Sequence, residues 1–154
     1  MYTEQDFAAI RAQKMRRMII TIIPVILLSA AAIYCAALRL QALTMILTII
    51  AGGLGMFMYG LFVKPVSAYY QHMDQVMHGR VRTLTGAFKQ MDDFPALRDG
   101  VYYYSMLINV GKMEDEEDDR LLYYDANLPR PDWKQGDMLT VTYHDKALGS
   151  WVRA

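Results

Sequence analysis

Two long apolar segments constrain the fold of this chain more than any other feature of its sequence. Residues 18–38 provide 21 positions and residues 42–63 provide 22, all without Asp, Glu, Lys or Arg. A helix rises about 1.5 Å per residue, so each segment reaches roughly 30 Å, the thickness of the hydrocarbon core of a bilayer. Backbone groups in lipid must bond within their own segment, which a helix achieves. The sequence therefore predicts a transmembrane hairpin over residues 18–63, with Arg39 as the only charge in its turn.

Two other interpretations of these segments fit less well. A buried helix of a soluble protein rarely stays uncharged on every face for about 20 residues. A cleavable signal peptide has an apolar region of about 7–15 residues, which is shorter than residues 18–38. The lipid bilayer is therefore the expected surrounding of both helices.

Charged residues beside the hairpin predict its orientation. Residues 1–17 contain four basic side chains against two acidic ones, and Lys64 follows the second apolar segment. Lys and Arg are retained on the cytoplasmic side of a membrane, so we expect a multi-pass protein of the cell (inner) membrane with both termini in the cytoplasm. Residues 1–17 are predicted to form an amphipathic juxtamembrane segment. Residues 64–79 are predicted to form a juxtamembrane helix that Pro65 separates from the second span.

Small residues gather on both predicted spans. In each span two of them lie four apart, a spacing that lets helix backbones approach closely in lipid. Two alternatives remain open: these residues pack the hairpin on itself, or they also contact another subunit. They are Ala32 and Ala36 in the first span and Ala51, Gly52 and Gly55 in the second.

The character of the sequence changes at Arg80. Five segments rich in Val, Thr, Tyr, Leu and Trp are separated by turn clusters, which is the pattern of short strands. Leu139, Val141 and Tyr143 alternate with polar side chains, as in a half-buried strand. Antiparallel strands of this number and length close most economically into a small barrel, because closure removes exposed edges. The predicted strands are residues 80–89, 101–112, 120–126, 137–144 and 148–153.

The predicted fold class is a membrane α-helical hairpin followed by a soluble all-β domain, a five-stranded OB-like barrel over residues 80–154. The chain ends in Gly136-Asp-Met-Leu-Thr-Val-Thr-Tyr143, a turn, and a last strand with Trp151-Val152. This ending resembles the C-terminal domain of the NfeD family, a membrane-anchored OB-type barrel. The resemblance implies a barrel used for assembly near a membrane partner. It implies no catalytic motif and transfers no residue roles.

The net charge of zero conceals an uneven distribution. Residues 64–154 contain 11 basic and 14 acidic side chains, which argues against a nucleic-acid partner held by general attraction to phosphates. One acidic run is predicted to be a solvated loop, with contact to a partner and binding of a divalent cation as alternatives. The run consists of Glu114, Asp115, Glu116, Glu117, Asp118 and Asp119.

No pattern in the sequence predicts catalysis. It contains no phosphate-binding glycine loop, nucleophile elbow or zinc-binding cysteine pair, and its one cysteine, Cys35, lies in the first apolar segment. Asp74 and His78 share a helical face but lack a third ligand, so a surface pair is expected. Met73 and Met77 are interpreted as packing residues rather than copper ligands. We therefore predict a protein that is not an enzyme and has no metal site or cofactor.

Three functions follow from the predicted architecture. The first is a non-enzymatic, membrane-anchored module whose cytoplasmic barrel assembles with itself or with a larger membrane protein. The second is a subunit of a small oligomeric transporter or channel, which the lack of charge in either span weakens. The third is a membrane-tethered OB-type binder of nucleic acid or nucleotides that uses exposed tyrosines and a basic groove. Its candidate residues are Tyr102, Tyr104, Arg80, Arg82 and Lys89.

Overall fold

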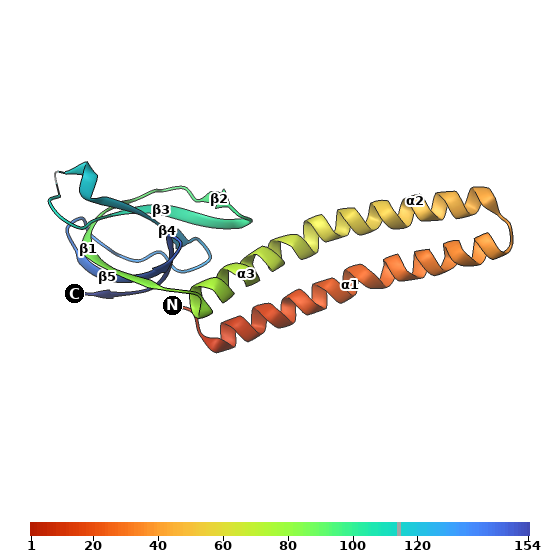
Figure 1. Ribbon diagram of the computed structural model, residues 1–154, viewed down its shortest axis with the longest axis horizontal. Coiled ribbons are helices and arrows are strands. Elements are labelled where there is room, and N and C mark those ends of the chain that lie inside the picture. Colours follow the sequence, from red (N-terminus) through yellow and green to blue (C-terminus); the bar gives the residue numbers. More distant parts are fainter. Residues whose placement is uncertain (114) are drawn as a thin grey trace. The chain divides into compact units, whose positions relative to one another are not determined.

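The computed structural model describes residues 1–113 and 115–154 (Figure 1). These residues form two compact units. One unit comprises Ala8–Tyr70 and is built from helices. The other combines Met1–Phe7 with Gln71–Ala154 and contains all of the strands.

The helical unit is a hairpin of two long helices (Figure 1). Helix α1 spans Glu4–Ala37 and is followed, after a short turn, by α2, which spans Gln41–Met58. Arg39 in the turn has a φ of 58°. At the start of α1, the Thr3 backbone N–H and hydroxyl donate to Asp6 Oδ2 at 3.0 and 2.7 Å. The Asp6 N–H donates back to Thr3 Oγ1 at 3.2 Å, so the first turn is capped reciprocally.

The segments on either side of the apolar residues continue the two long helices. Helix α1 already includes residues 4–17, and the π-helical turn η1 (Tyr59–Val63) joins α2 to α3 (Lys64–His78) without a break. The backbone N–H that follows η1 donates five residues back, to the carbonyl of Tyr59. This wider turn accommodates Pro65, whose ring would clash with the carbonyl four residues earlier in a regular helix. Pro65 therefore lies within a continuous helix rather than ending it.

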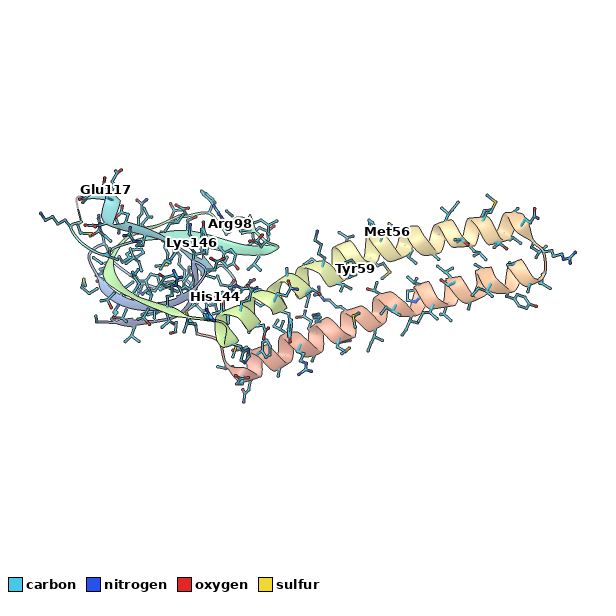
Figure 2. All side chains as sticks on the ribbon, in the orientation of Figure 1. Met56, Tyr59, Arg98, Glu117, His144 and Lys146 are labelled. Atoms are coloured by element: carbon cyan, nitrogen blue, oxygen red, sulfur yellow. The ribbon has the colours of Figure 1, made fainter. Side chains whose placement is uncertain are left out.

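Most apolar side chains of the hairpin are exposed. Glu4–Ala37 and the continuous helix Gln41–His78 are each long and apolar enough to cross a membrane, and 11% of the most apolar 18-residue window of each is buried. Leu27 is 65% exposed, Ile49 71%, and Met56, labelled in Figure 2, 82%. The core helix of a soluble protein would bury such side chains. The hairpin thus presents an apolar surface to its surroundings.

The other unit contains six strands. They are β1 (Arg82–Met91), β2 (Ala96–Arg98), β3 (Val101–Asn109), β4 (Asp119–Asp125), β5 (Met138–His144) and β6 (Ala147–Arg153). Their order in the sheet is β1-β5-β6-β4-β3-β2, and a further pairing of β1 with β3 closes five of them into a ring. The short β2 is attached outside this ring, to β3. Strands β4 and β6 are parallel, whereas all other neighbours are antiparallel.

The five predicted strands are confirmed, with ends within three residues of the prediction. The prediction of only antiparallel neighbours is wrong for β4 and β6. One edge of β3 pairs with β1 and the other edge pairs with β4, so β6 can close the ring only by pairing with β4. Strand β6 runs antiparallel to β5, and this direction makes its pairing with β4 parallel. Strand β2 was not predicted, and its three side chains are all exposed.

Large apolar side chains fill the interior of the ring. Ile108 and Leu139 are fully buried. Trp133, in the loop before β5, packs edge-on against Trp151 of β6 with 4.9 Å between ring centroids. Gly86 lets β1 approach β3 closely, because a Cβ at this position would lie 2.6 Å from Ile108 Cγ2. This core holds the strands in the register that assembles the site described next.

Candidate functional site

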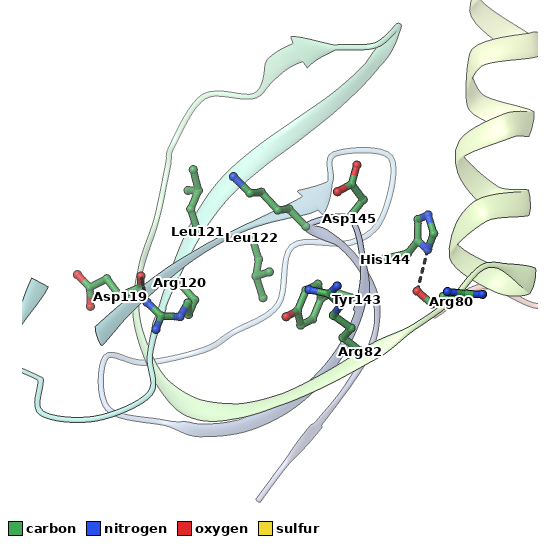
Figure 3. A pocket seen from close by; sticks show the side chains of 10 residues that line it. Arg80, Arg82, Asp119, Arg120, Leu121, Leu122, Tyr143, His144 and Asp145 are labelled. Atoms are coloured by element: carbon green, nitrogen blue, oxygen red, sulfur yellow. Dashed lines mark hydrogen bonds between the residues drawn. The ribbon is translucent and has the colours of Figure 1, made fainter. Parts of the chain in front are cut away.

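A pocket opens where β1 begins and β5 turns into β6 (Figure 3). Its volume is about 720 Å³, within the usual size range of small-molecule sites. Four basic side chains line it, together with two carboxylates, two aromatic rings and two leucines. The lining residues are Arg80, Arg82, Asp119, Arg120, Leu121, Leu122, Tyr143, His144, Asp145 and Lys146.

Strand pairing brings these residues together from distant parts of the sequence. Arg82 at the start of β1 is paired with Tyr143 at the end of β5. Lys146 lies in the turn between β5 and β6, and its carbonyl accepts a hydrogen bond of 2.8 Å from the Tyr123 N–H of β4. This bond holds the turn beside the first residues of β4, which include Arg120. Figure 3 shows Arg120 and Tyr143 extending into the same space from opposite sides.

His144 fixes the backbone where the chain enters β1. Its Nδ1 lies 2.9 Å from the carbonyl oxygen of Arg80, and because a carbonyl only accepts, His144 donates this hydrogen bond (Figure 3). A Cβ at Gly79 would lie 2.7 Å from the same ring nitrogen. Gly79 therefore ends α3 and also leaves room for His144.

The pocket has an excess of positive charge. The Asp119 carboxylate already accepts from Lys89 Nζ at 2.6 Å and from Asn109 Nδ2 at 2.8 Å. These two hydrogen bonds hold the pKa of the Asp119 carboxyl below its ordinary value. Among the residues that the structure describes, no carboxylate forms an ion pair with the basic side chains of the pocket, Arg80, Arg82, Arg120 and Lys146.

The sequence prediction found half of these basic residues. Arg80 and Arg82 of the predicted basic groove line the pocket, whereas Lys89 pairs with Asp119 instead. The other two basic residues carry no sequence signal, because only the pairing of β4 with the β5–β6 turn brings them near β1. The predicted stacking residue Tyr102 is exposed on β3 but does not line this pocket.

A second polar cluster lies buried in the same unit. His72 of α3 is 7% exposed, and Asp125 at the end of β4 is 1% exposed. The Tyr2 hydroxyl donates to Asp125 Oδ2 at 2.7 Å and lies 3.0 Å from His72 Nε2. The Tyr103 hydroxyl lies 2.9 Å from His72 Nδ1. The cluster joins the first residues of the chain, the end of α3 and two strands of the ring.

The hydrogen-bond partners assign the proton positions in this cluster. Tyr2 donates its one hydroxyl hydrogen to Asp125, so its oxygen accepts from His72 Nε2–H. His72 Nδ1 then accepts from the Tyr103 hydroxyl, which is the pattern of a neutral imidazole. Burial lowers the pKa of His72, against the opposite influence of Asp125, and favours this neutral form. Burial and the charges of Asp125 and Asp99 raise the pKa of Tyr103. We assign the cluster a structural role.

The lowered pKa of His72 predicts that the fold loses stability on mild acidification. The unfolded chain binds a proton at this residue near pH 6.5, whereas the folded chain binds it only at lower pH. Stability is therefore complete above about pH 6.5 and declines as the pH falls from there towards the folded-state pKa. Thermal unfolding of the full chain in detergent at pH 7.5 and pH 5.5 measures the decline. In His72→Gln the melting temperature is expected to depend less on pH.

The matched control for this prediction is His78→Gln, because His78 is half exposed and pairs with Asp74 at the surface. Its melting temperature is expected to change with pH as the wild type does. Equal pH dependence in wild type and His72→Gln would contradict the assignment.

No local pattern in the sequence reveals the His72 cluster. The hydrogen-bond partners of His72, Tyr2 and Tyr103, lie 70 and 31 residues away, and their approach depends on the closed ring.

Asp74 and His78 form a surface pair, with 3.1 Å between Oδ1 and Nδ1. The Glu4 carboxylate lies 3.9 Å from His78 Nε2. Across residues 1–113 and 115–154, no three His, Cys, Asp or Glu side chains gather as a metal site requires. The contacts of His78 with Asp74 and Glu4 therefore remain exposed side-chain contacts at the surface.

The acidic run is only partly the solvated loop that the sequence predicts. Glu114 lies outside the described residues. Asp115 caps the 3-10 turn η2 (Glu116–Asp118) by accepting a backbone hydrogen bond of 3.0 Å. Asp118 also accepts from a backbone N–H, at 3.1 Å, and Asp119 begins β4 and forms an ion pair. The prediction is wrong for Asp119, because this residue begins β4 and Lys89 of β1 neutralises its carboxylate.

The small residues of the hairpin have different surroundings. Ala32 and Ala51 are buried, and Gly55 faces a valine of α1 whose Cγ2 would lie 3.4 Å from an added Cβ. At Gly52 an added Cβ would meet nothing within 4 Å, and Ala36 is exposed. The two helices therefore approach each other at some of these positions and leave others open.

Comparisons with known proteins give no relative. No protein-family model matches the chain, and no curated protein or solved structure is significantly similar to it. The resemblance to the NfeD family thus rests on the C-terminal residues alone.

Proposed function

We propose that this chain is a non-enzymatic, membrane-anchored module. In this proposal the hairpin crosses the cell (inner) membrane twice, both termini lie in the cytoplasm, and the ring of strands is an OB-type barrel. The barrel assembles with a second copy of the chain or with a larger membrane protein. Tethering confines it to the membrane plane, which raises its effective concentration for partners there.

The exposed apolar surface of the hairpin is the observation on which this proposal rests. Residues 18–38 and 42–63 contain no Asp, Glu, Lys or Arg, and side chains such as Leu27 and Ile49 are exposed over most of their area. In water this surface would oppose solubility, at about 25 cal/mol for each Å² of apolar area. Lipid tails remove that penalty, while the helices satisfy their own backbone.

The connectivity of the ring supports the OB interpretation. Without the short β2, the first strand pairs with the second and the fourth, and the third pairs in parallel with the fifth. This is the strand order of an OB-type barrel, a fold that binds its ligands on one face and in its loops.

Contacts at the open end of the hairpin support the proposed orientation. Lys14 Nζ lies 4.4 Å from the centroid of the Tyr70 ring, and Arg17 donates to the carbonyl of Phe62 at 3.4 Å. Positive charge and an aromatic ring are thus gathered at one end, whereas the turn at the other end contains only Arg39. An excess of positive charge at the end of the hairpin opposite its turn retains that end in the cytoplasm.

Gly52→Leu is expected to lower the native mass of the chain in mild detergent. An added Cβ at Gly52 meets nothing within 4 Å, and Gly52 lines a groove with Ala32 and Ile33 of α1, so the larger side chain fills this groove and blocks a partner helix there. Gly55 is a poorer test site, because it already faces α1. Native mass spectrometry of the detergent-solubilised full chain measures the change.

Gly53→Leu is the matched control for Gly52→Leu. Gly53 is equally open, but it lies about 100° further around the helix at nearly the same depth. We expect this variant to keep the native mass of the wild type. If Gly52→Leu also keeps that mass, and no other membrane protein co-purifies with the wild type, assembly through this face is refuted.

A further inference from the structure

We propose that the basic pocket of the ring binds a phosphate-bearing ligand that has at least two negative charges, either a phosphorylated small molecule or the headgroup of an anionic lipid. This inference goes beyond the proposed function, because it does not depend on assembly. It rests on three observations: the local charge, the conformation of the β5–β6 turn, and the mixture of donors and apolar surface in the pocket.

The charge of the pocket is opposite to that of its domain. Residues 80–154 contain ten Lys or Arg and thirteen Asp or Glu, yet four of the ten basic residues line this one pocket. Of its two carboxylates, Asp119 is already neutralised by Lys89. Gathered cations repel one another, and without an ion-pair partner they favour a bound anion.

The turn that carries Lys146 is held in a conformation that its residues disfavour. Asp145 has a φ of 45° and Lys146 a φ of 78°. A two-residue hairpin turn with positive φ at both positions normally takes Asn-Gly or Asp-Gly. Lysine at the second position is therefore strained where glycine would be relaxed, and strain of this kind is typical of functional positions. The conformation places a lysine at the rim of the pocket.

The chemistry of the lining suits a phosphate ester. Arginine presents a planar fork of donors that matches phosphate oxygens, and Arg82 and Arg120 come from different strands of the ring. The hydroxyl of Tyr143 adds a neutral donor. Leu121 and Leu122 supply an apolar wall for the organic part of the ligand. A volume of about 720 Å³ exceeds what a bare phosphate fills.

The experiment titrates inorganic pyrophosphate into the full chain, held in nanodiscs of phosphatidylcholine, by isothermal calorimetry at about 50 mM salt. We expect saturable binding of one pyrophosphate per chain. The double variant Arg82→Gln/Arg120→Gln is expected to weaken this binding at least tenfold, because it removes two charge-assisted sets of hydrogen bonds. Asp145→Asn is expected to strengthen it, because it removes a negative charge from the lining of the pocket.

The variant Lys146→Gly distinguishes an effect on ligand binding from an effect on the stability of the fold. Glycine relaxes the positive φ of this position, so the variant is expected to melt at a higher temperature than the wild type and yet to bind pyrophosphate several-fold more weakly. The charge-matched control is Lys112→Gln/Lys134→Gln, which removes two exposed lysines outside the pocket and is expected to leave the affinity within twofold.

A second arm of the experiment distinguishes the sources of the ligand. In this arm, phosphatidic acid replaces a fifth of the phosphatidylcholine in the nanodiscs. If the natural ligand is a lipid headgroup, the phosphatidic acid competes with pyrophosphate and weakens its apparent binding. If the natural ligand is a soluble phosphorylated compound, the titration is unchanged. The proposal is overturned if pyrophosphate shows no saturable binding, or if the control double variant weakens binding as much as the pocket variant. It is also overturned if a single-stranded oligonucleotide binds more tightly than pyrophosphate and spans residues outside the pocket.

Discussion

Replacing Asp125 with alanine is expected to destabilise the unit that contains the strands by about 3 kcal/mol or more. The Asp125 carboxylate is buried and accepts from the Tyr2 hydroxyl at 2.7 Å and from the backbone and side-chain amides of Asn127, both at 2.9 Å. Without it, the Tyr2 hydroxyl and the two amides of Asn127 lose the acceptor that this buried carboxylate provides. At about 4–8 °C per kcal/mol, the melting temperature should fall by more than about 10 °C. Near-ultraviolet circular dichroism of the full chain in detergent measures this change.

The matched control for this substitution is Asp132→Ala. The Asp132 side chain is 90% exposed and pairs with Arg153 at 3.0 Å, a surface pair worth about 0–1 kcal/mol. Tyr2→Phe removes one hydroxyl of the cluster and should give an intermediate loss. A melting temperature for Asp125→Ala as high as that of Asp132→Ala would show that the buried cluster does not hold the unit together.

The double variant Leu27→Arg/Ile49→Arg is expected to leave only a minor fraction of the chain in the membrane. Both side chains lie on exposed positions of their helices, so in water each substitution would change stability by no more than about 0.5 kcal/mol. At the centre of a bilayer each arginine costs about 2.5–3.5 kcal/mol. The share of expressed chain that stays in membranes after an alkaline carbonate wash measures the difference.

The charge-matched control is Leu38→Arg/Leu40→Arg, at the turn beside Arg39. Both leucines are exposed at the end of the first span and in the turn, where an arginine side chain reaches the polar headgroups, so this variant should stay in the membrane. Equal membrane fractions for the two double variants would mean that the faces of Leu27 and Ile49 do not contact lipid.

Features that depend on composition within one segment were predictable from the sequence. The hairpin follows from 21 and 22 uncharged positions in a row, and β5 follows from the alternation of Leu139, Val141 and Tyr143 with polar residues. Both patterns reflect whether each side chain prefers water or an apolar environment, which is a property of the single residue. The boundary expected at Pro65 failed because a π-helical turn, which depends on backbone hydrogen bonding rather than composition, accommodates the ring.

Features that depend on the register between strands were not predictable. Arg80 and Arg82 were recognised as a basic pair, but Arg120 and Lys146 join them only because β4 lies beside the β5–β6 turn. In the same way, no residue pattern near His72 predicts that Asp125 and the two tyrosines lie beside this histidine. Sequence patterns describe which face of an element is apolar, whereas the partners of a polar side chain depend on how the ring closes.

Whether lipid surrounds both apolar helices is tested most directly by removing the detergent from the purified wild-type chain. We expect the chain to aggregate in buffer as the detergent is withdrawn and to stay monodisperse when nanodiscs are supplied. A freely soluble monomer with unchanged helical and near-ultraviolet circular dichroism in buffer alone would contradict it.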